Sequence, residues 1–106
     1  MPANNEAHER LLADALVALS DRGHLAWKQK VGIGVFNHHL VRFGMKGQSD
    51  IFVVRQPDGL FVTVEVKTGR GKLTDHQKFW FSAVARVGGR HVEGRSVDQS
   101  VREVEA

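Results

Sequence analysis

Two kinds of hydrophobic periodicity alternate along this chain. Between Glu6 and Asp21, leucine and alanine recur every three or four residues, which is typical of a helix with one apolar face. That face comprises Leu11, Leu12, Ala15, Leu16 and Leu19. We expect Asn4 or Asn5 to cap the start of this helix and Gly23 to end it.

The middle of the chain has the residue types of strands. Segment 25–43 is rich in β-branched and aromatic residues but is interrupted by glycines, so we expect one strand or an irregular hairpin there. Segment 51–55 is a continuous apolar run, as in a strand buried on both faces. Segment 60–67 resumes in β-branched sequence after the turn Pro57-Asp58-Gly59. The last two segments therefore predict a β-hairpin.

The sequence after this hairpin returns to helical spacing. Thr74 is suited to cap a helix that runs to about Val87 and stops at Gly88-Gly89. The apolar positions that we place together on one face of this helix are Phe79, Ala83 and Val87.

The end of the chain predicts one more strand, over 91–94, and a short helix over 97–104. The expected order is α-β-β-β-α-β-α. A chain of 106 residues has too little apolar surface for two cores, so residues 1–106 should form a single domain. We therefore predict an α/β fold with a central mixed β-sheet flanked by helices.

Composition narrows the classes of protein. The chain has no cysteine, which excludes disulfides, thiolate zinc sites and cysteine nucleophiles. It has no run near the roughly 18 apolar residues of a membrane span and no signal-peptide pattern, so we expect a cytoplasmic protein. The formal net charge of +3 favours a polyanionic partner only weakly. Many of the basic residues lie in the middle of the chain, namely Lys28, Lys30, Arg42, Lys46, Lys67, Arg70, Lys72 and Lys78.

The candidate chemistry lies on the two strands of the predicted hairpin. Successive strand residues point to opposite faces, so Glu65 and Lys67 share one face and Val66 lies on the other. Asp50 stands at the start of the preceding strand, and antiparallel pairing would bring it toward Glu65 and Lys67. The pattern predicts two converging carboxylates beside one amine.

Two carboxylates provide the hard oxygen ligands that Mg²⁺ prefers, and the backbone carbonyl of Val66 is a further candidate ligand. Such an ion activates water and stabilises negative charge on a phosphate. Lys67 would orient the attacking water or neutralise developing charge. A Glu-x-Lys pair on a strand is by itself more often a solvated ion pair, so the assignment depends on the neighbouring segments.

Three segments together resemble one nuclease family. Residues 47–51 (Gly-Gln-Ser-Asp-Ile), 64–67 (Val-Glu-Val-Lys) and 73–77 (Leu-Thr-Asp-His-Gln) are similar in order and spacing to the virus-type replication-repair nuclease (VRR-NUC) domain. This family belongs to the PD-(D/E)xK nuclease superfamily, which has a restriction-endonuclease-like core. Ser49-Asp50 stands where the superfamily has its nominal Pro-Asp, in agreement with the VRR-NUC pattern.

The resemblance implies a role for each matching residue. Asp50 and Glu65 would bind Mg²⁺ or Mn²⁺, Lys67 would assist the attacking water, and Gln77 would lie near the active site. The family often has a metal-binding Glu in its first helix; Glu6 is the better candidate and Glu9 the second, and spacing does not decide between them.

The resemblance also implies a substrate and an assembly. Small stand-alone members of the family come from phages and bacteria, resemble Holliday-junction resolvases and act as homodimers. We therefore expect a metal-dependent endonuclease that cuts branched DNA as a homodimer, in the cytoplasm of a bacterial or phage-infected cell.

Several other residues have two interpretations. Arg42, Lys46, Arg70 and Lys72 either contact DNA phosphates or lie in solvated loops, and the sequence leaves both open. For His38, His39 and His76 we favour surface or DNA-facing positions over a metal site. Trp27 is a candidate for stacking on bases, whereas Trp80 is better placed in a core or a dimer interface.

Two rival functions remain. One is a non-catalytic DNA-binding or scaffold protein that kept the nuclease fold, but the trio of Asp50, Glu65 and Lys67 has no use in such a protein. The other is a nonspecific or restriction-type endonuclease. The chain has no evident insertion long enough to read base edges, which argues against the restriction type.

Overall fold

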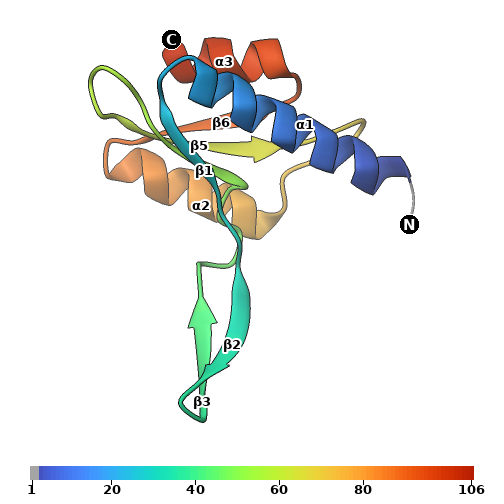
Figure 1. Cartoon of the computed structure of the whole chain (residues 1–106), viewed down its shortest axis with the longest axis vertical. Coiled ribbons are helices and arrows are strands. Elements are labelled where there is room, and N and C mark those ends of the chain that lie inside the picture. Colours follow the sequence, from blue (N-terminus) through green and yellow to red (C-terminus); the bar gives the residue numbers. More distant parts are fainter. Residues whose placement is uncertain (1–2) are drawn as a thin grey trace.

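A four-stranded sheet lies between helices in the computed structural model, which describes residues 3–106 (Figure 1). The helices are α1 (Ala3–Asp21), α2 (Asp75–Arg86) and α3 (Val97–Glu105). The strands are β1 (Leu25–Lys28), β2 (Gly32–Phe36), β3 (His39–Phe43), β4 (Ile51–Val54), β5 (Phe61–Val66) and β6 (Arg90–Gly94). None of the helices within residues 3–106 is both long and apolar enough to cross a membrane.

The sheet is mixed, as predicted. Its strands are ordered β1-β4-β5-β6. β4 pairs antiparallel with β1 and β5, whereas β5 and β6 are parallel and α2 forms the connection between them. In this register Glu65 of β5 lies beside Glu93 of β6, and Ile51 of β4 lies beside Val64 of β5. The predicted hairpin of the fourth and fifth strands is confirmed.

One face of the sheet carries the main core. Helices α1 and α3 cover this face (Figure 1), and the sheet contributes alternate residues to it, as the period of two requires. The buried residues of this core are Leu12, Ala15 and Leu19 of α1, Ile51, Val53, Val62, Val64, Val66 and Val92 of the strands, and Val104 of α3. The predicted apolar face of the first helix is therefore confirmed.

The boundaries of α1 differ from the prediction at one end. The helix begins at Ala3, so Asn4 and Asn5 lie inside it and neither is the cap that we expected. It ends as predicted, with Gly23 in the left-handed region at φ 90°. Just beyond, the buried side chain of His24 bonds Glu105 of α3 through Nε2 (2.9 Å), which holds the last helix against this corner.

Helix α2 covers the opposite face and presents a different side from the one predicted. Phe79 and Val87 are 66% and 76% exposed, while Phe81 and Val84 are buried. Trp80 stacks on Phe52 of β4 with 5.5 Å between ring centroids. Positions 79, 83 and 87 and positions 80, 81 and 84 are both spaced like a helical stripe, and the fit of the aromatic side chains to the sheet selects the second.

Segment 25–43 forms more structure than the single strand or irregular hairpin expected. It supplies β1 to the sheet and then a separate hairpin of β2 and β3, which projects from the body of the molecule (Figure 1). The turn consists of Asn37 and His38, both in the left-handed region at φ 51° and 64°, as a two-residue hairpin turn requires. A turn of this type normally contains glycine, and Asn37-His38 contains none, so the turn could not be recognised from the sequence.

Candidate active site

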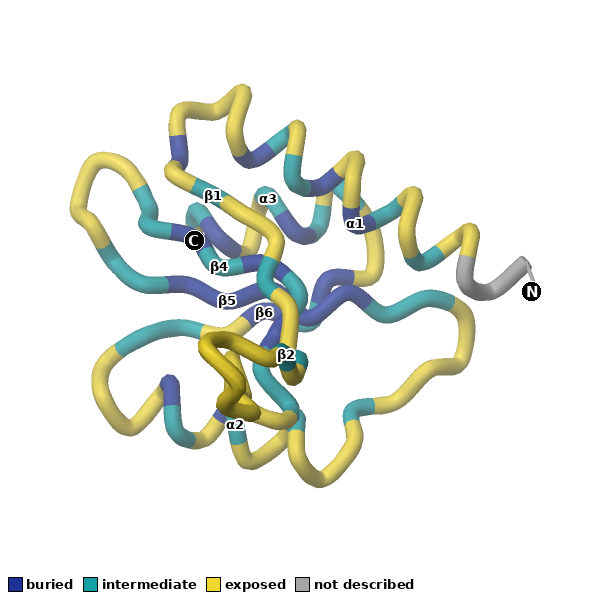
Figure 2. The backbone as a smooth tube through the Cα atoms, turned by 60° about the horizontal axis from the view of Figure 1, so that its bottom comes forward, coloured by how far each residue is buried: buried dark blue, intermediate teal, exposed yellow. Residues whose placement is uncertain are grey.

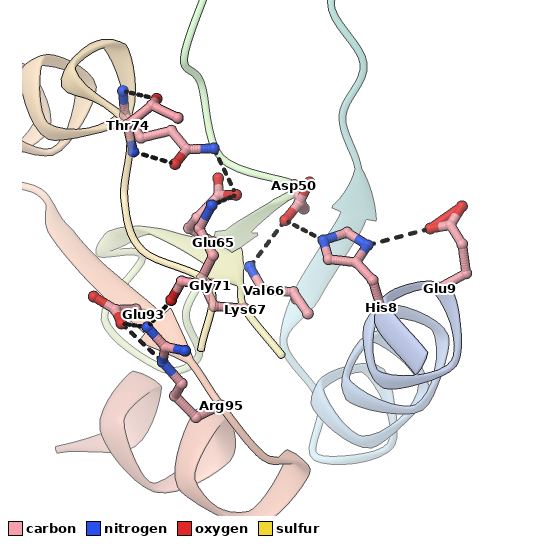
Figure 3. Close-up of polar contacts among 11 residues, drawn as sticks. His8, Glu9, Asp50, Glu65, Val66, Lys67, Gly71, Thr74, Glu93 and Arg95 are labelled. Carbon is pink, nitrogen blue, oxygen red and sulfur yellow. Dashed lines mark hydrogen bonds and ion pairs between the residues drawn. The ribbon is translucent and has the colours of Figure 1, made fainter. Parts of the chain in front are cut away.

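The predicted site residues come together at one end of the central strands. Asp50 directly precedes β4, Glu65 lies near the end of β5, and Lys67 follows β5. Gln77 lies in the first turn of α2 and completes the group. Figure 3 shows Asp50, Glu65 and Lys67 in this arrangement, with His8 approaching from α1. The sheet register brings together residues that are far apart in the sequence, as the hairpin predicted.

Glu65 is the most unusual ionisable group of this site. Its residue is 4% exposed, and one carboxylate oxygen, Oε2, accepts a hydrogen bond from Gln77 Nε2 (3.0 Å) and lies 3.9 Å from Lys67 Nζ. The other oxygen, Oε1, is buried and has no hydrogen-bond partner among the described residues. A buried carboxylate oxygen without a partner is costly, so this position is suited to a cation or a proton.

The pKa of Glu65 is raised to about 8, chiefly by burial and next by the nearby charge of Asp50, while Lys67 opposes the shift. Glu93, the neighbour of Glu65 on β6, adds a smaller repulsion. Two carboxylates that disfavour each other's charge in this way are stabilised by a shared divalent cation.

Asp50 is held in place by the backbone of the neighbouring strand. Its Oδ2 atom accepts a hydrogen bond from the amide of Val66 (2.9 Å), and its side chain is 25% exposed. The preceding residue, Ser49, is buried and donates to Thr63 Oγ1 (3.2 Å). Asp50 therefore has a fixed position at the strand end while part of its carboxylate remains accessible.

The start of α2 orients Gln77. Thr74 is the N-cap, as predicted, and its Oγ1 accepts from the backbone amide of Gln77 (3.2 Å). In return, Gln77 Oε1 accepts from the backbone amide of Thr74 (2.9 Å), which completes a capping box. With the carbonyl oxygen engaged in this way, the amide nitrogen of Gln77 points to Glu65.

A close backbone contact sets the position of this helix start. A Cβ atom at Gly47 would lie 2.3 Å from the carbonyl oxygen of His76, so only glycine fits there. Gly47 also has φ 86°, which glycine adopts without strain. The glycine of the first motif thus brings the loop before Asp50 against the helix that carries Gln77.

The first helix contributes a residue that the sequence analysis missed. His8 Nε2 lies 3.5 Å from Asp50 Oδ2. The two glutamates that we considered, Glu6 and Glu9, are both exposed, and Glu9 Oε2 lies 3.7 Å from His8 Nδ1. His8 extends the buried stripe of Leu12, Ala15 and Leu19 by one helical turn. This spacing is the signal in the sequence that could have identified His8 as a residue on the inner side of α1.

The donor set fits a hydrated hard cation. Among residues 3–106, no three histidine or carboxylate side chains are already gathered as a complete metal site. Mg²⁺ does not need such a cage, because it keeps several waters and is commonly held by one or two carboxylates. Asp50 together with Glu65, whose Oε1 lacks a partner within the described residues, meets that requirement.

The predicted DNA-binding residues fall into two separate places. Arg42 and Lys46 line a pocket of about 500 Å³ at the base of the β2–β3 hairpin. Arg70 and Lys72 are exposed in the loop that follows Lys67. Lys72 also lines a smaller pocket of about 270 Å³ with Lys78, Arg95 and Glu93, and the sequence analysis had not proposed Lys78 or Arg95.

Comparison with known proteins identifies this arrangement. No curated protein sequence matches the chain. A solved structure described as a VRR_NUC domain is similar with a TM-score of 0.67 and 22% sequence identity, over 92% of this chain and 94% of that chain. At that identity the similarity shows the fold. The family model of the VRR-NUC domain matches residues 2–98. The chain therefore belongs to the VRR-NUC domain family and is a DNA-processing protein with a nuclease fold.

Proposed function

We propose that this protein is a divalent-metal-dependent endonuclease that hydrolyses phosphodiester bonds in branched DNA, in the manner of a Holliday-junction resolvase. The observation that carries the proposal is the buried carboxylate of Glu65, which lacks a partner for Oε1 within residues 3–106 and lies close to the Asp50 carboxylate and Lys67. Burying such groups together costs stability, and perturbed ionisable groups of this kind are typical of catalytic sites.

Asp50 and Glu65 would hold Mg²⁺ or Mn²⁺, with the backbone carbonyl of Val66 as a further ligand. When bound, the ion supplies Lewis-acid stabilisation of the charge that develops on the phosphate and lowers the pKa of water. The chain itself keeps the two carboxylates in place, through the Val66 amide for Asp50 and the Gln77 amide for Glu65.

Lys67 would act on the attacking water and on the phosphate. Its side chain is 15% exposed, and its ammonium group lies 3.9 Å from Glu65 Oε2. An ammonium group at this distance from the carboxylate is held near the site with donors left over for water or a phosphate oxygen. Charge stabilisation by a fixed donor of this kind is often a large part of catalysis.

DNA would be held by the two basic groups that flank the site. We propose that Arg42 and Lys46 at the hairpin base, and Arg70 and Lys72 in the loop after Lys67, contact backbone phosphates. All four residues are exposed. Phosphate contacts of this kind give strongly salt-dependent binding without base specificity, which suits a structure-selective enzyme.

The protein would act as a homodimer through the β2–β3 hairpin. Within residues 3–106 this hairpin pairs with no other strand, and Figure 2 shows it exposed beside the buried central sheet. Its large apolar side chains, with those at its base, are all exposed, namely Val31, Ile33, Val35, Phe36, Leu40, Val41, Phe43 and Met45. An isolated two-stranded hairpin is barely stable, so a surface of this kind indicates a partner.

A second copy of the chain is the partner that fits. The accessible area of these exposed apolar residues is on the order of 700 Å² per chain, close to the ~800 Å² that each partner buries in a standard interface. Among the residues of the two strands, Arg42 is the one lysine or arginine, so the hairpin is poor in the charges that a DNA-binding surface needs. Two copies related by a two-fold axis would also match the two-fold symmetry of a four-way junction.

The experiment that tests this function is a cleavage assay on labelled four-way junction, flap, duplex and single-stranded DNA. Each substrate is incubated with Mg²⁺, with Mn²⁺ and with chelator, for the natural protein and for Lys67→Ala. We expect metal-dependent cutting of the junction on both sides, loss of cutting in the variant, and DNA binding that is retained. Lys30→Ala, which removes an exposed lysine outside the site, is the matched control.

Other outcomes would support the rival functions. Tight binding to DNA without cutting under either metal would favour a scaffold protein. Cutting of all substrates alike would favour a nonspecific nuclease, and cutting of one duplex sequence would favour a restriction-type enzyme. Full activity of Lys67→Ala would contradict the role given to Lys67.

A further inference from the structure

A small pocket opens beside the carboxylates of the proposed site. It has a volume of about 270 Å³, and its lining residues are Lys72, Leu73, Lys78, Glu93 and Arg95. These residues come from the loop after Lys67, from the first half of α2 and from the end of β6. Glu93 is the neighbour of Glu65 across the parallel strands β5 and β6, which lie ~4.8 Å apart. The pocket therefore adjoins the proposed catalytic carboxylate.

Hydrogen bonds from Arg95 fix one wall of this pocket. Its Nε donates to Glu93 Oε2 (2.8 Å), and its Nη2 donates to the same oxygen and to the carbonyl oxygen of Gly71 (2.6 Å). Its Nη1 donates to the carbonyl oxygen of Gly69 (3.4 Å). Figure 3 shows Arg95 close to both Glu93 and Gly71. The loop that carries Lys72 is therefore tied to the end of β6.

The charges of the pocket favour an anion. Arg95 and Glu93 form an ion pair with each other, so their charges largely cancel. Lys72 and Lys78 are exposed, and neither ammonium group forms an ion pair with a carboxylate among the described residues. The pocket thus has an excess of two positive charges. Uncompensated lysines in a concave site attract phosphate groups.

The size and lining of the pocket restrict its ligand. Its volume of about 270 Å³ is below the roughly 300–1,000 Å³ of pockets that enclose a whole small molecule. Leu73 is the one apolar residue of the lining, so the pocket offers no aromatic surface on which a base could stack. A phosphate group of the DNA backbone needs only cationic donors, and it is the ligand that fits.

We propose that this pocket binds one internal phosphate of the cleaved DNA strand, close to the scissile phosphate, and that Lys72 and Lys78 are its two donors. The inference rests on the proposed function, since it defines the path of the strand through the same site. The pocket begins one strand spacing from Glu65, and DNA advances ~3.4 Å per nucleotide, so the bound phosphate lies within about three nucleotides of the bond that is cut. Binding there fixes which phosphodiester bond meets the carboxylates.

A diffuse role for the same lysines has a different consequence. If Lys72 and Lys78 only added positive charge to the surface, each nearby phosphate would contribute a little and none would be essential. If they bind one phosphate, then neutralising that phosphate and removing Lys78 eliminate the same contact. The two changes are then not additive, and this separates the two roles.

The test measures binding of the full chain to a four-way junction in chelator, by fluorescence anisotropy. Uncharged methylphosphonate linkages replace single phosphates, one position at a time, on both sides of the cleavage site that is mapped with divalent metal. We expect one position, within about three nucleotides of that site, at which the neutral linkage weakens binding roughly fivefold. Lys78→Ala should weaken binding to the unmodified junction by a similar factor, lower the salt dependence by about one counterion, and make the linkage at that position almost without effect.

Arg86→Ala is the matched control. Arg86 is an exposed cation on the same helix, roughly 12 Å along the axis from Lys78. Its replacement should leave the sensitivity to that one linkage unchanged. A second comparison uses a junction nicked at the same position, with either a phosphate or a hydroxyl at the end of the strand. We expect the phosphorylated nick to bind no more tightly than the intact junction.

Three results would overturn the inference and leave the proposed function intact. They are equal small losses at all positions, full sensitivity to the linkage in Lys78→Ala, and tighter binding of the phosphorylated nick, which would assign the pocket to a terminal phosphate. Absence of metal-dependent cutting of any of the DNA substrates would overturn the proposed function and, with it, the path assigned to the strand.

Discussion

Gln77 donates its side-chain amide to Glu65 over 3.0 Å while its carbonyl oxygen accepts from the backbone amide of Thr74. One side chain therefore caps helix α2 and orients a carboxylate of the proposed site. The helix start and the site are coupled by this single amide, because neither half of it can turn without the other.

This coupling predicts different results for two neighbouring substitutions. Thr74→Ala removes one bond of the capping box, so it should cost about 1 kcal/mol of stability and leave cleavage nearly unchanged. Gln77→Ala should have a similar cost and also lower the cleavage rate by roughly tenfold or more, because Glu65 loses its orienting donor. Urea unfolding and junction cleavage measured on both variants test this. Equal activity of the two would mean that Gln77 acts only as a cap.

The raised pKa of Glu65 predicts a pH dependence of stability. In the folded protein this pKa is about 8, whereas the usual value is near 4.5. Between these values the native state keeps a proton that the unfolded state has released, so the free energy of unfolding should fall as pH rises from about 4.5 to about 8. The stabilisation that the protonated Glu65 carboxyl provides is complete below a pH of about 4.5, and it is lost as the pH rises through about 8.

Glu65→Gln should remove this contribution. Other groups, including the histidines, titrate in the same range, so the measured quantity is the difference between variant and natural protein. With chelator present, Glu65→Gln should gain stability relative to the natural protein by a few kcal/mol as the pH is raised across this window. Denaturant unfolding at several pH values measures it. Parallel stability curves for the two proteins would show that the pKa of Glu65 is not raised.

The contact at Gly47 predicts a strong local requirement for glycine. Gly47→Ala would place a Cβ atom 2.3 Å from the His76 carbonyl oxygen at a φ of 86°, so it should cost about 2–4 kcal/mol through overlap and backbone strain. Gly59→Ala is the matched control, because Gly59 also has a positive φ, 74°, but a Cβ atom there meets no other heavy atom within 4 Å. It should cost about 1 kcal/mol. Thermal unfolding distinguishes them, and equal losses would show that only the backbone conformation matters.

The exposed hairpin predicts a way to make a monomer. Val35 and Leu40 are cross-strand neighbours and are each 69% exposed, so replacing both with Gln should prevent association while removing only the contact between these two side chains within one chain. Light scattering after gel filtration should show the mass falling from twice 11.8 kDa to 11.8 kDa. Val17→Gln, which changes an apolar residue 59% exposed on α1, should leave the dimer intact. A natural protein that is already monomeric would contradict the hairpin interface.

The amino-acid sequence by itself determined those features that depend on consecutive residues. The alternation of β5 placed Glu65 and Lys67 on the opposite side from Val64 and Val66, because a strand repeats every two residues whatever it packs against. Thr74 was identifiable as an N-cap because the bonds of a capping box span only three residues. The residues of the proposed site were therefore identified from short motifs.

Only the tertiary structure decided which residues of distant segments meet. It selected Phe81 and Val84 over Phe79 and Val87 as the buried side of α2, and it brought His8 of α1 close to Asp50. Both outcomes depend on the rotation of a helix about its axis, which follows from how side chains of that helix fit the sheet. Local sequence restricts the apolar stripe of a helix to one or two choices, and long-range packing of the sheet and helices selects among them.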